Sequence, residues 1–185
     1  MWSAVALAGV WLAVAATIVA AYQSRTTPED VAAFAERQDF AALSAEQRRD
    51  AVDALASRVN RLSFEQRRDP AMQRAIRELF EQMNEPERLR YVDRALPKGL
   101  EQLFESINAM EPAERRALVD ETLSDMRRDL DRASRAEIEA RVEDPAFQRV
   151  IDRGMEAYLS EASAEAKLDL EPLIHAMQSE LRELR

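Results

Sequence analysis

Histidine and paired carboxylates are the residue types in this chain that could carry chemistry, and there is only one histidine. His175 follows Glu171 by one helical turn, so the two side chains can share one face of a helix. A di-iron bundle needs Glu-x-x-His motifs on two helices, and structural zinc normally needs four Cys or His ligands. Cysteine is absent. We therefore expect no metal and no cofactor, and a partly exposed His175.

Paired acids and glycines offer no further catalytic pattern. Glu29-Asp30 and Glu143-Asp144 stand beside prolines at expected helix starts, where carboxylates interact favourably with the helix dipole. The three glycines are isolated, so no phosphate-binding loop is present, and one histidine supports no Ser-His-Asp set. The sequence predicts a non-catalytic protein with no identifiable small-molecule substrate. An enzyme of unfamiliar type stays open as an alternative.

Arginine doublets form the most conspicuous charge pattern. They are Arg48-Arg49, Arg67-Arg68, Arg115-Arg116 and Arg127-Arg128. Acidic residues flank each doublet, so we expect solvated ion pairs within each helix rather than a patch for anionic lipid. The chain as a whole carries a net charge of −9, which repels phosphate backbones and argues against a nucleic-acid partner.

The elements that position these residues are expected to be helices. Charged residues make up 33% of the 185 residues, apolar residues 46%, and glycine is rare. Apolar side chains recur with helical spacing between capping sequences. These sequences begin at Thr27, Ser44, Ser63, Asp69, Asn84, Ser134 and Asp144. The pattern predicts an all-α protein, an irregular bundle of about seven to eight short amphipathic helices.

An uncharged apolar segment opens the chain. Residues 2–22 would form a helix about 30 Å long, enough to cross the hydrocarbon of a bilayer. Trp2 and Tyr22 stand at its ends, where amphipathic rings favour the membrane interface. We expect a transmembrane anchor at 1–23, then a juxtamembrane linker and short helix at 24–43. The helical domain is expected at 44–185.

A cleaved signal peptide is the alternative interpretation of this segment, with Val19-Ala20-Ala21 as the cleavage site. No basic residue precedes the apolar run, and the run is longer than the apolar region of a signal peptide. An anchor in a bacterial inner membrane is therefore favoured. The few arginines that flank the segment leave the side of the membrane on which the domain lies open.

Two stretches of the soluble part resemble each other. Residues 69–76 and 144–151 share six of eight positions, and Gln47-Arg48-Arg49 is echoed by Glu114-Arg115-Arg116. Helix starts follow each copy at Asn84 and Ser163. The same order of elements suggests a duplicated helical unit, 44–96 and 111–185. The alternative is that capping rules alone make unrelated helix starts look alike.

The last helix carries the candidate partner or dimer face. Its residues are Leu170, Ile174, Met177, Leu181 and Leu184, spaced by four and three as in a coiled coil. Only two heptads are covered, so packing of this face into the domain's own core is the stronger expectation.

A local motif also occurs twice. Leu43-Ser44-Ala45-Glu46-Gln47 and Leu62-Ser63-Phe64-Glu65-Gln66 resemble the Leu-Thr-x-x-Gln signature of small periplasmic helical stress proteins. Serine replaces threonine in both copies, and the likeness covers ten residues. The resemblance implies a helical cradle that shields unfolding client proteins in the envelope.

Three functions follow as expectations. The first is a membrane-tethered helical interaction module, an adaptor or accessory subunit with a protein partner or a second copy of itself. The second is an envelope chaperone or stress protein with an exported helical domain. The third is an enzyme of unfamiliar type.

Overall fold

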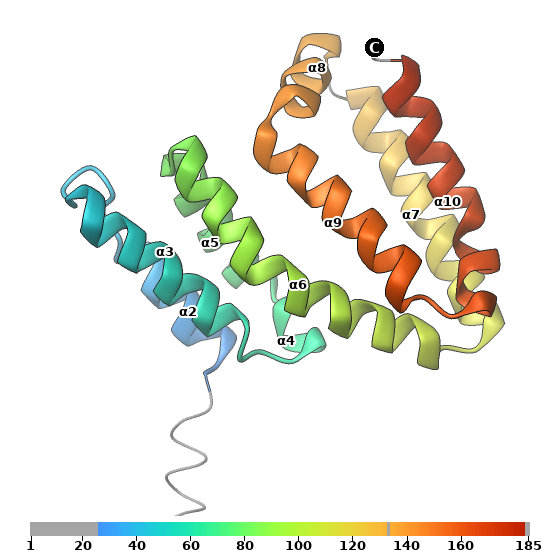
Figure 1. Cartoon of the computed structure of the whole chain (residues 1–185), viewed down its shortest axis with the longest axis horizontal. Helices are drawn as coiled ribbons and strands as arrows, with labels where there is room; N and C mark the ends of the chain where they lie inside the picture. The colour runs from blue at the N-terminus through green and yellow to red at the C-terminus, as the bar shows by residue number, and fades with distance from the viewer. Residues whose placement is uncertain (1–25, 133, 184–185) are drawn as a thin grey trace, which may run out of the picture.

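The computed structural model describes residues 26–132 and 134–183, and every secondary-structure element among them is an α-helix (Figure 1). The expectation of an all-α bundle is thereby confirmed for this part of the chain. Its nine helices are α2 (Pro28–Glu36), α3 (Ala45–Val59), α4 (Phe64–Arg67), α5 (Pro70–Gln82), α6 (Glu85–Ala109), α7 (Pro112–Arg132), α8 (Arg135–Glu143), α9 (Pro145–Glu161) and α10 (Ala164–Glu183).

Capping residues begin most of these helices where the sequence predicts them. Reciprocal capping boxes start at Thr27, Ser44, Ser63, Asn84 and Ser134. In each box the cap side chain accepts from a first-turn N–H, and a side chain three residues on accepts from the N–H of the cap. Asp69 and Asp144 accept a first-turn N–H of α5 and α9, and a proline follows each of them.

The N-terminal half is built around one closed core. Its largest fully buried side chains are Phe40, Leu55, Leu62, Met72, Leu79, Val31 and Val52. They come from α2, α3, α5 and the connecting loops. Helix α2 packs on α5, and α3 packs on the first part of α6. The segment expected as a juxtamembrane linker and short helix therefore contributes Val31 and Phe40 to this core.

Helix α6 joins the two halves of the molecule, and Figure 1 shows it running from the N-terminal helices to the C-terminal ones. It continues through Pro97, which has no N–H to donate and therefore frees a carbonyl in the preceding turn. Asn60, at the end of α3, donates its side-chain amide to the Arg94 carbonyl at 2.7 Å. This bond ties the end of α3 to α6 in the turn before the proline.

The C-terminal half has a smaller core. Helix α9 packs along α6, and α7 packs along α10. The buried residues where these pairs meet are Phe104, Ile107, Val119, Ala157, Ala162, Ala166 and Leu170. Asn108 of α6 accepts the Ser163 N–H at 2.9 Å and donates to the Glu161 carbonyl at 2.8 Å, which ties the turn between α9 and α10 to α6.

Within the described residues, no helix has both the length and the apolar composition needed to cross a bilayer. The expected membrane anchor, residues 1–23, lies outside the described part of the chain.

Candidate functional site

The residues predicted as a partner face are divided by the structure. Leu170 lies in the C-terminal core with 6% of its surface exposed. Ile174 and Met177, one and two turns further along α10, are only half-buried. The side chains of Leu181 and Leu184 lie outside the described residues. The beginning of this stripe therefore packs inward, and its middle remains accessible.

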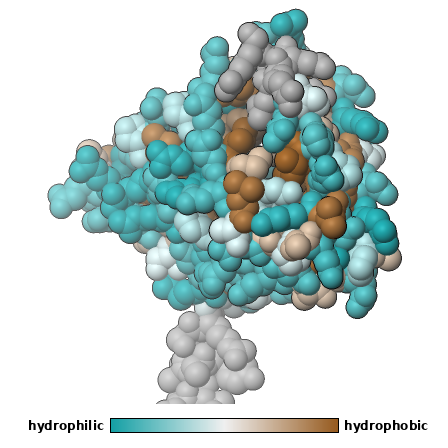
Figure 2. Space-filling model, turned by 45° about the vertical axis from the view of Figure 1, so that its right-hand side comes forward, coloured by the Kyte–Doolittle hydropathy of each residue, from teal (hydrophilic) through white to brown (hydrophobic). Residues whose placement is uncertain are grey.

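Other apolar side chains of the C-terminal half are left half-buried as well. We call them, with Ile174 and Met177, the C-terminal apolar face: Leu123, Met126 and Leu130 of α7, Phe147, Ile151 and Met155 of α9, and Leu173 of α10. Figure 2 shows apolar side chains gathered on this side of the molecule and bordered by hydrophilic ones. Three of the nine are methionines, whose flexible side chains adapt to varied partners.

This face exists because α9 and the pair of α7 and α10 are held together mainly at one end. Three alanines make the contact at that end. Ala157 lies in the last turns of α9, Ala162 directly follows α9, and Ala166 lies in the first turn of α10. Helix α8, which connects α7 to α9, has no buried residue. Large apolar side chains away from the alanines are consequently only partly covered, although Leu123 and Leu173 still pack against the C-terminal core.

The electrostatic surroundings of the C-terminal apolar face are acidic. Acidic residues outnumber basic ones in each of α7, α8, α9 and α10. Leu159 and Leu168, near the turn between α9 and α10, add further exposed apolar surface, with 63% and 71% of their area accessible. An apolar surface carried by helices with a net acidic composition favours a partner that is apolar and basic.

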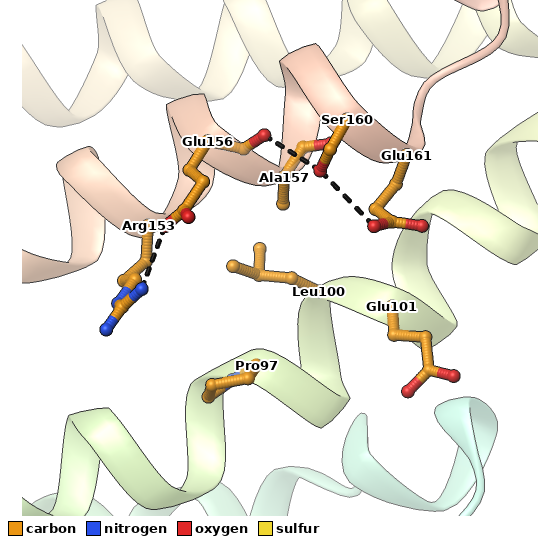
Figure 3. Close-up of a pocket in the computed structure, with 8 residues that line it drawn as sticks. All are labelled: Pro97, Leu100, Glu101, Arg153, Glu156, Ala157, Ser160 and Glu161. Atoms are coloured by element: carbon orange, nitrogen blue, oxygen red, sulfur yellow. Dashed lines mark hydrogen bonds and ion pairs between the residues drawn. The ribbon is translucent and has the colours of Figure 1, made fainter.

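A cavity of about 220 Å³ lies between α6 and α9, and Figure 3 shows the residues that line it. Pro97, Leu100 and Ala157 form its apolar side, and polar residues from both helices form the rest. Arg153 pairs with Glu156 at 2.8 Å. The Ser160 hydroxyl lies 3.0 Å from the Glu156 carbonyl and 3.2 Å from a Glu161 carboxylate oxygen.

This arrangement does not activate Ser160 as a nucleophile. An activated serine needs a base that accepts its proton and a group that orients the base, whereas Ser160 bonds to the backbone of its own helix. Glu156 exposes 67% of its side chain and Glu101 exposes 48%, and both are paired with cations. The cavity therefore resembles an ordinary polar crevice between two packed helices.

His175 lies on the exposed side of α10. Its Nε2 is 3.6 Å from Glu171, and both side chains are more than half exposed. The described residues hold no group of three or more potential metal ligands. The pair predicted from its one-turn spacing is thus present and fully solvated.

Three of the four arginine doublets do not behave as the sequence predicts, and one of them is Arg67-Arg68, whose Arg67 is half-buried and meets no carboxylate among the described residues. Arg48 forms two hydrogen bonds to Glu87 of α6, at 2.6 and 2.7 Å, and donates to the Phe40 carbonyl at 2.7 Å. Glu87 is 5% exposed. The expectation of a solvated pair within one helix is therefore wrong for Arg48, which joins α3 to α6 across 39 residues.

Arg115 occupies the matching position of the C-terminal half. It is 3% exposed, donates to Asp169 of α10 at 2.8 Å and to the Met110 carbonyl at 2.6 Å. The expectation of intrahelical pairing is wrong here too. The sequence does contain a signal for this orientation. Arg48 and Arg115 each precede a buried valine, Val52 or Val119, by four residues, so each arginine shares the inward face of its helix with that valine. The Arg128–Asp125 pair of the last doublet is exposed and intrahelical, as expected.

The hydrogen bonds from Arg48 lower the pKa of Glu87 below its ordinary value, and the Asn84 N–H of the helix cap adds to this effect. Arg90 does the same for Asp53, which it meets through two bonds of 2.6 and 2.7 Å. Both carboxylates join α3 to α6, so these perturbed groups belong to helix packing rather than to a reacting centre.

Comparison with known proteins gives no relative for this geometry. No protein-family model matches the chain, no curated protein matches it, and no solved structure matches it. The contacts, burial and charges of the chain itself are therefore the basis for a functional proposal.

Proposed function

We propose that this chain is a non-catalytic, membrane-tethered helical interaction module, an adaptor or accessory subunit. The observation that carries the proposal is the C-terminal apolar face, whose large apolar side chains are only partly covered by the rest of the molecule. Soluble proteins rarely keep contiguous apolar surface accessible unless a partner covers it.

The tether is proposed from the sequence. Residues 2–22 carry no charge and have the length of a bilayer-spanning helix. Helix α2 begins at Pro28, a few residues later, and its Val31 is fully buried. A domain so close to its anchor would present its surfaces to other proteins at the same membrane, which raises the effective concentration of such partners.

The partner expected for the C-terminal apolar face is a helix of another protein. Helices dock on such surfaces through apolar side chains spaced three and four residues apart. The net acidic composition of α7 and α10 favours Lys and Arg on the flanks of the partner helix. A second copy of this chain is acidic and fits the charge pattern less well.

Site-specific photocrosslinking in intact membranes tests the proposal. A photoreactive residue at Met177 or Met155 should give one discrete protein adduct. The same residue at Arg74, exposed on α5 in the other half, should give none. Absence of any adduct from both methionine positions above the Arg74 background would contradict the proposal.

The same experiment separates the alternatives. A client-shielding chaperone would give adducts of many different masses, and a homodimer would give one adduct of twice the chain's mass. A topology reporter fused after Arg185 completes the test, because a cytoplasmic C-terminus would eliminate an exported chaperone.

A further inference from the structure

A second cavity lies in the N-terminal half of the chain, whereas the C-terminal apolar face belongs to the other half. Its volume is about 330 Å³, at the lower end of the roughly 300–1,000 Å³ of small-molecule sites. Met72, Ile76, Phe80 and Tyr91 give it apolar walls, and Arg67 and Arg77 line it as well. Its lining includes no carboxylate, on a chain with 35 acidic residues.

Arg67 is the unusual member of this cavity. It is half-buried, its Nε is buried without an acceptor, and its Nη2 donates only to the Asn60 side chain at 3.3 Å. Arg48, Arg90 and Arg115 each meet a carboxylate within 2.8 Å. Arg67 meets none among the described residues, although buried charges are normally paired.

Neighbouring groups hold the Arg67 guanidinium without neutralising it. An added Cβ at Gly99 of α6 would lie 3.2 Å from Nη1, so the absence of a side chain at this position lets the guanidinium approach the helix. Burial lowers the pKa of Arg67 from its ordinary value and raises the pKa of Tyr91 to about 12. Tyr91 therefore stays neutral near pH 7 and supplies no counter-charge.

Arg77 adds a second cation on the exposed side of the cavity. It lies on α5 one residue after Ile76 and forms no ion pair among the described residues. Gln73 donates its side-chain amide to the Arg67 carbonyl at 3.1 Å, which ties α5 to the end of α4. The cavity thus combines a half-buried cation, an exposed cation and apolar walls.

We propose that this cavity binds a carboxylate that ends a short apolar chain or ring, with the carboxylate paired to Arg67 and the apolar part against Met72, Ile76 and Phe80. A carboxylate suits a planar guanidinium with free donors, because it accepts two parallel hydrogen bonds. A phosphate group is more strongly hydrated and would find few donors in these walls. Such a ligand is either a free small acid or the C-terminus of a peptide that ends in an apolar residue.

Isothermal titration calorimetry on the full chain in lipid nanodiscs tests the proposal, with empty nanodiscs as the blank. The probes are 3-phenylpropanoate, octanoate and a tetrapeptide that ends in Phe-Leu with a free carboxylate. The neutral counterparts are 3-phenylpropanol, octanol and the amidated peptide. At least one acid should bind at submillimolar concentration, and its neutral counterpart at least tenfold more weakly. Binding of the small acids or of the peptide alone identifies the source of the carboxylate.

Substitutions then locate the site. Arg67→Gln should weaken binding at least tenfold, whereas Arg68→Gln, at an exposed neighbour outside the cavity, should leave it unchanged. Ile76→Trp fills the cavity while keeping both arginines, and it should abolish binding even if Arg67→Gln fails to fold. Equal affinity for acid and neutral probes, no binding by any acid, or unchanged affinity in Ile76→Trp would overturn the proposal.

Discussion

The two halves of this molecule pair their helices in a similar way but fill their cores with different side chains. In the N-terminal half α2 packs on α5 and α3 packs on α6; in the C-terminal half α6 packs on α9 and α7 packs on α10. In each half, an arginine from the first turns of its second helix forms an ion pair with one buried member, Glu87 in the pair of Arg48 and Arg115 in the pair with Asp169. The N-terminal core is filled by Phe, Leu and Met side chains, whereas alanines make up much of the C-terminal one.

The two halves share their order of helices but differ in the residues that fill their cores. We infer that one set of residues determines the order of the helices and another determines how closely they pack. Arg48 and Arg115 sit at equivalent places, and Val52 and Val119 follow them by four residues. The duplication of a helical unit, which the sequence suggests, stays a prediction. The large residues that close the first core have smaller or half-exposed counterparts in the second, which leaves the C-terminal half with accessible apolar side chains.

The largest expected effect comes from breaking the buried arginine pairs. Arg115→Ala leaves Asp169 without its cation, and Arg48→Ala does the same to Glu87. Removing one partner of a buried pair costs about 3–5 kcal/mol, so both variants should lose about 3 kcal/mol of unfolding free energy. Chemical denaturation of the full chain, followed by circular dichroism, measures the loss.

The neighbouring arginines are matched controls for this prediction. Arg49→Ala and Arg116→Ala change an exposed member of the same doublet and should leave the unfolding free energy nearly unchanged. If Arg115→Ala were no more destabilising than Arg116→Ala, the two halves would not share a common stabilising pair.

Core substitutions give an effect of comparable size and address the difference between the halves directly. Leu79→Ala opens a cavity beside a side chain that is 2% exposed, and about 3 kcal/mol of stability should be lost. Ile174→Ala removes the same kind of side chain from the half-buried C-terminal apolar face and should cost about 1 kcal/mol. The same denaturation measurement compares them. Equal losses would mean that the C-terminal half is as closed as the N-terminal one.

Much of the fold was readable from the sequence because its signals are local. A capping side chain and the N–H that it satisfies lie within three residues, so the starts at Ser44, Asn84 and Ser134 were predicted correctly. The inward turn of Arg48 and Arg115 was missed because their carboxylates lie 39 and 54 residues away in the chain. Their four-residue spacing from Val52 and Val119 indicates an inward face, but no local pattern indicates which carboxylate each arginine meets.

The candidate surfaces were less predictable than the helices. Helical spacing places Leu170, Ile174 and Met177 on one stripe, but it cannot show where a neighbouring helix stops covering that stripe. The cavity at Arg67 combines residues from α3, α4, α5 and α6, and only the tertiary structure brings them together. The prediction of an anchor at residues 1–23 concerns a segment outside the described residues and stays a prediction.

The smallest expected effect is a pH dependence that belongs to the N-terminal half. Hydrogen bonds from Arg48 lower the pKa of Glu87 in the folded state, so the ionised carboxylate stabilises the fold above the unfolded pKa of about 4.3. That stabilisation is lost as the pH falls below this value through the lower folded pKa. Glu87→Gln removes the titrating group, so thermal unfolding should show a difference from wild type at neutral pH that narrows with acidification.

The narrowing is expected to be partial, because a protonated Glu87 can still accept the Asn84 N–H at 2.9 Å and keep the cap of α6 in place. Glu165→Gln serves as the comparison in the C-terminal half. Its carboxylate is 82% exposed and 3.9 Å from Arg115, so the variant should follow the wild-type curve at every pH. A difference between Glu87→Gln and wild type that stayed constant from neutral to acidic pH would show that Glu87 stabilises the N-terminal half by its shape and hydrogen bonds rather than by its charge.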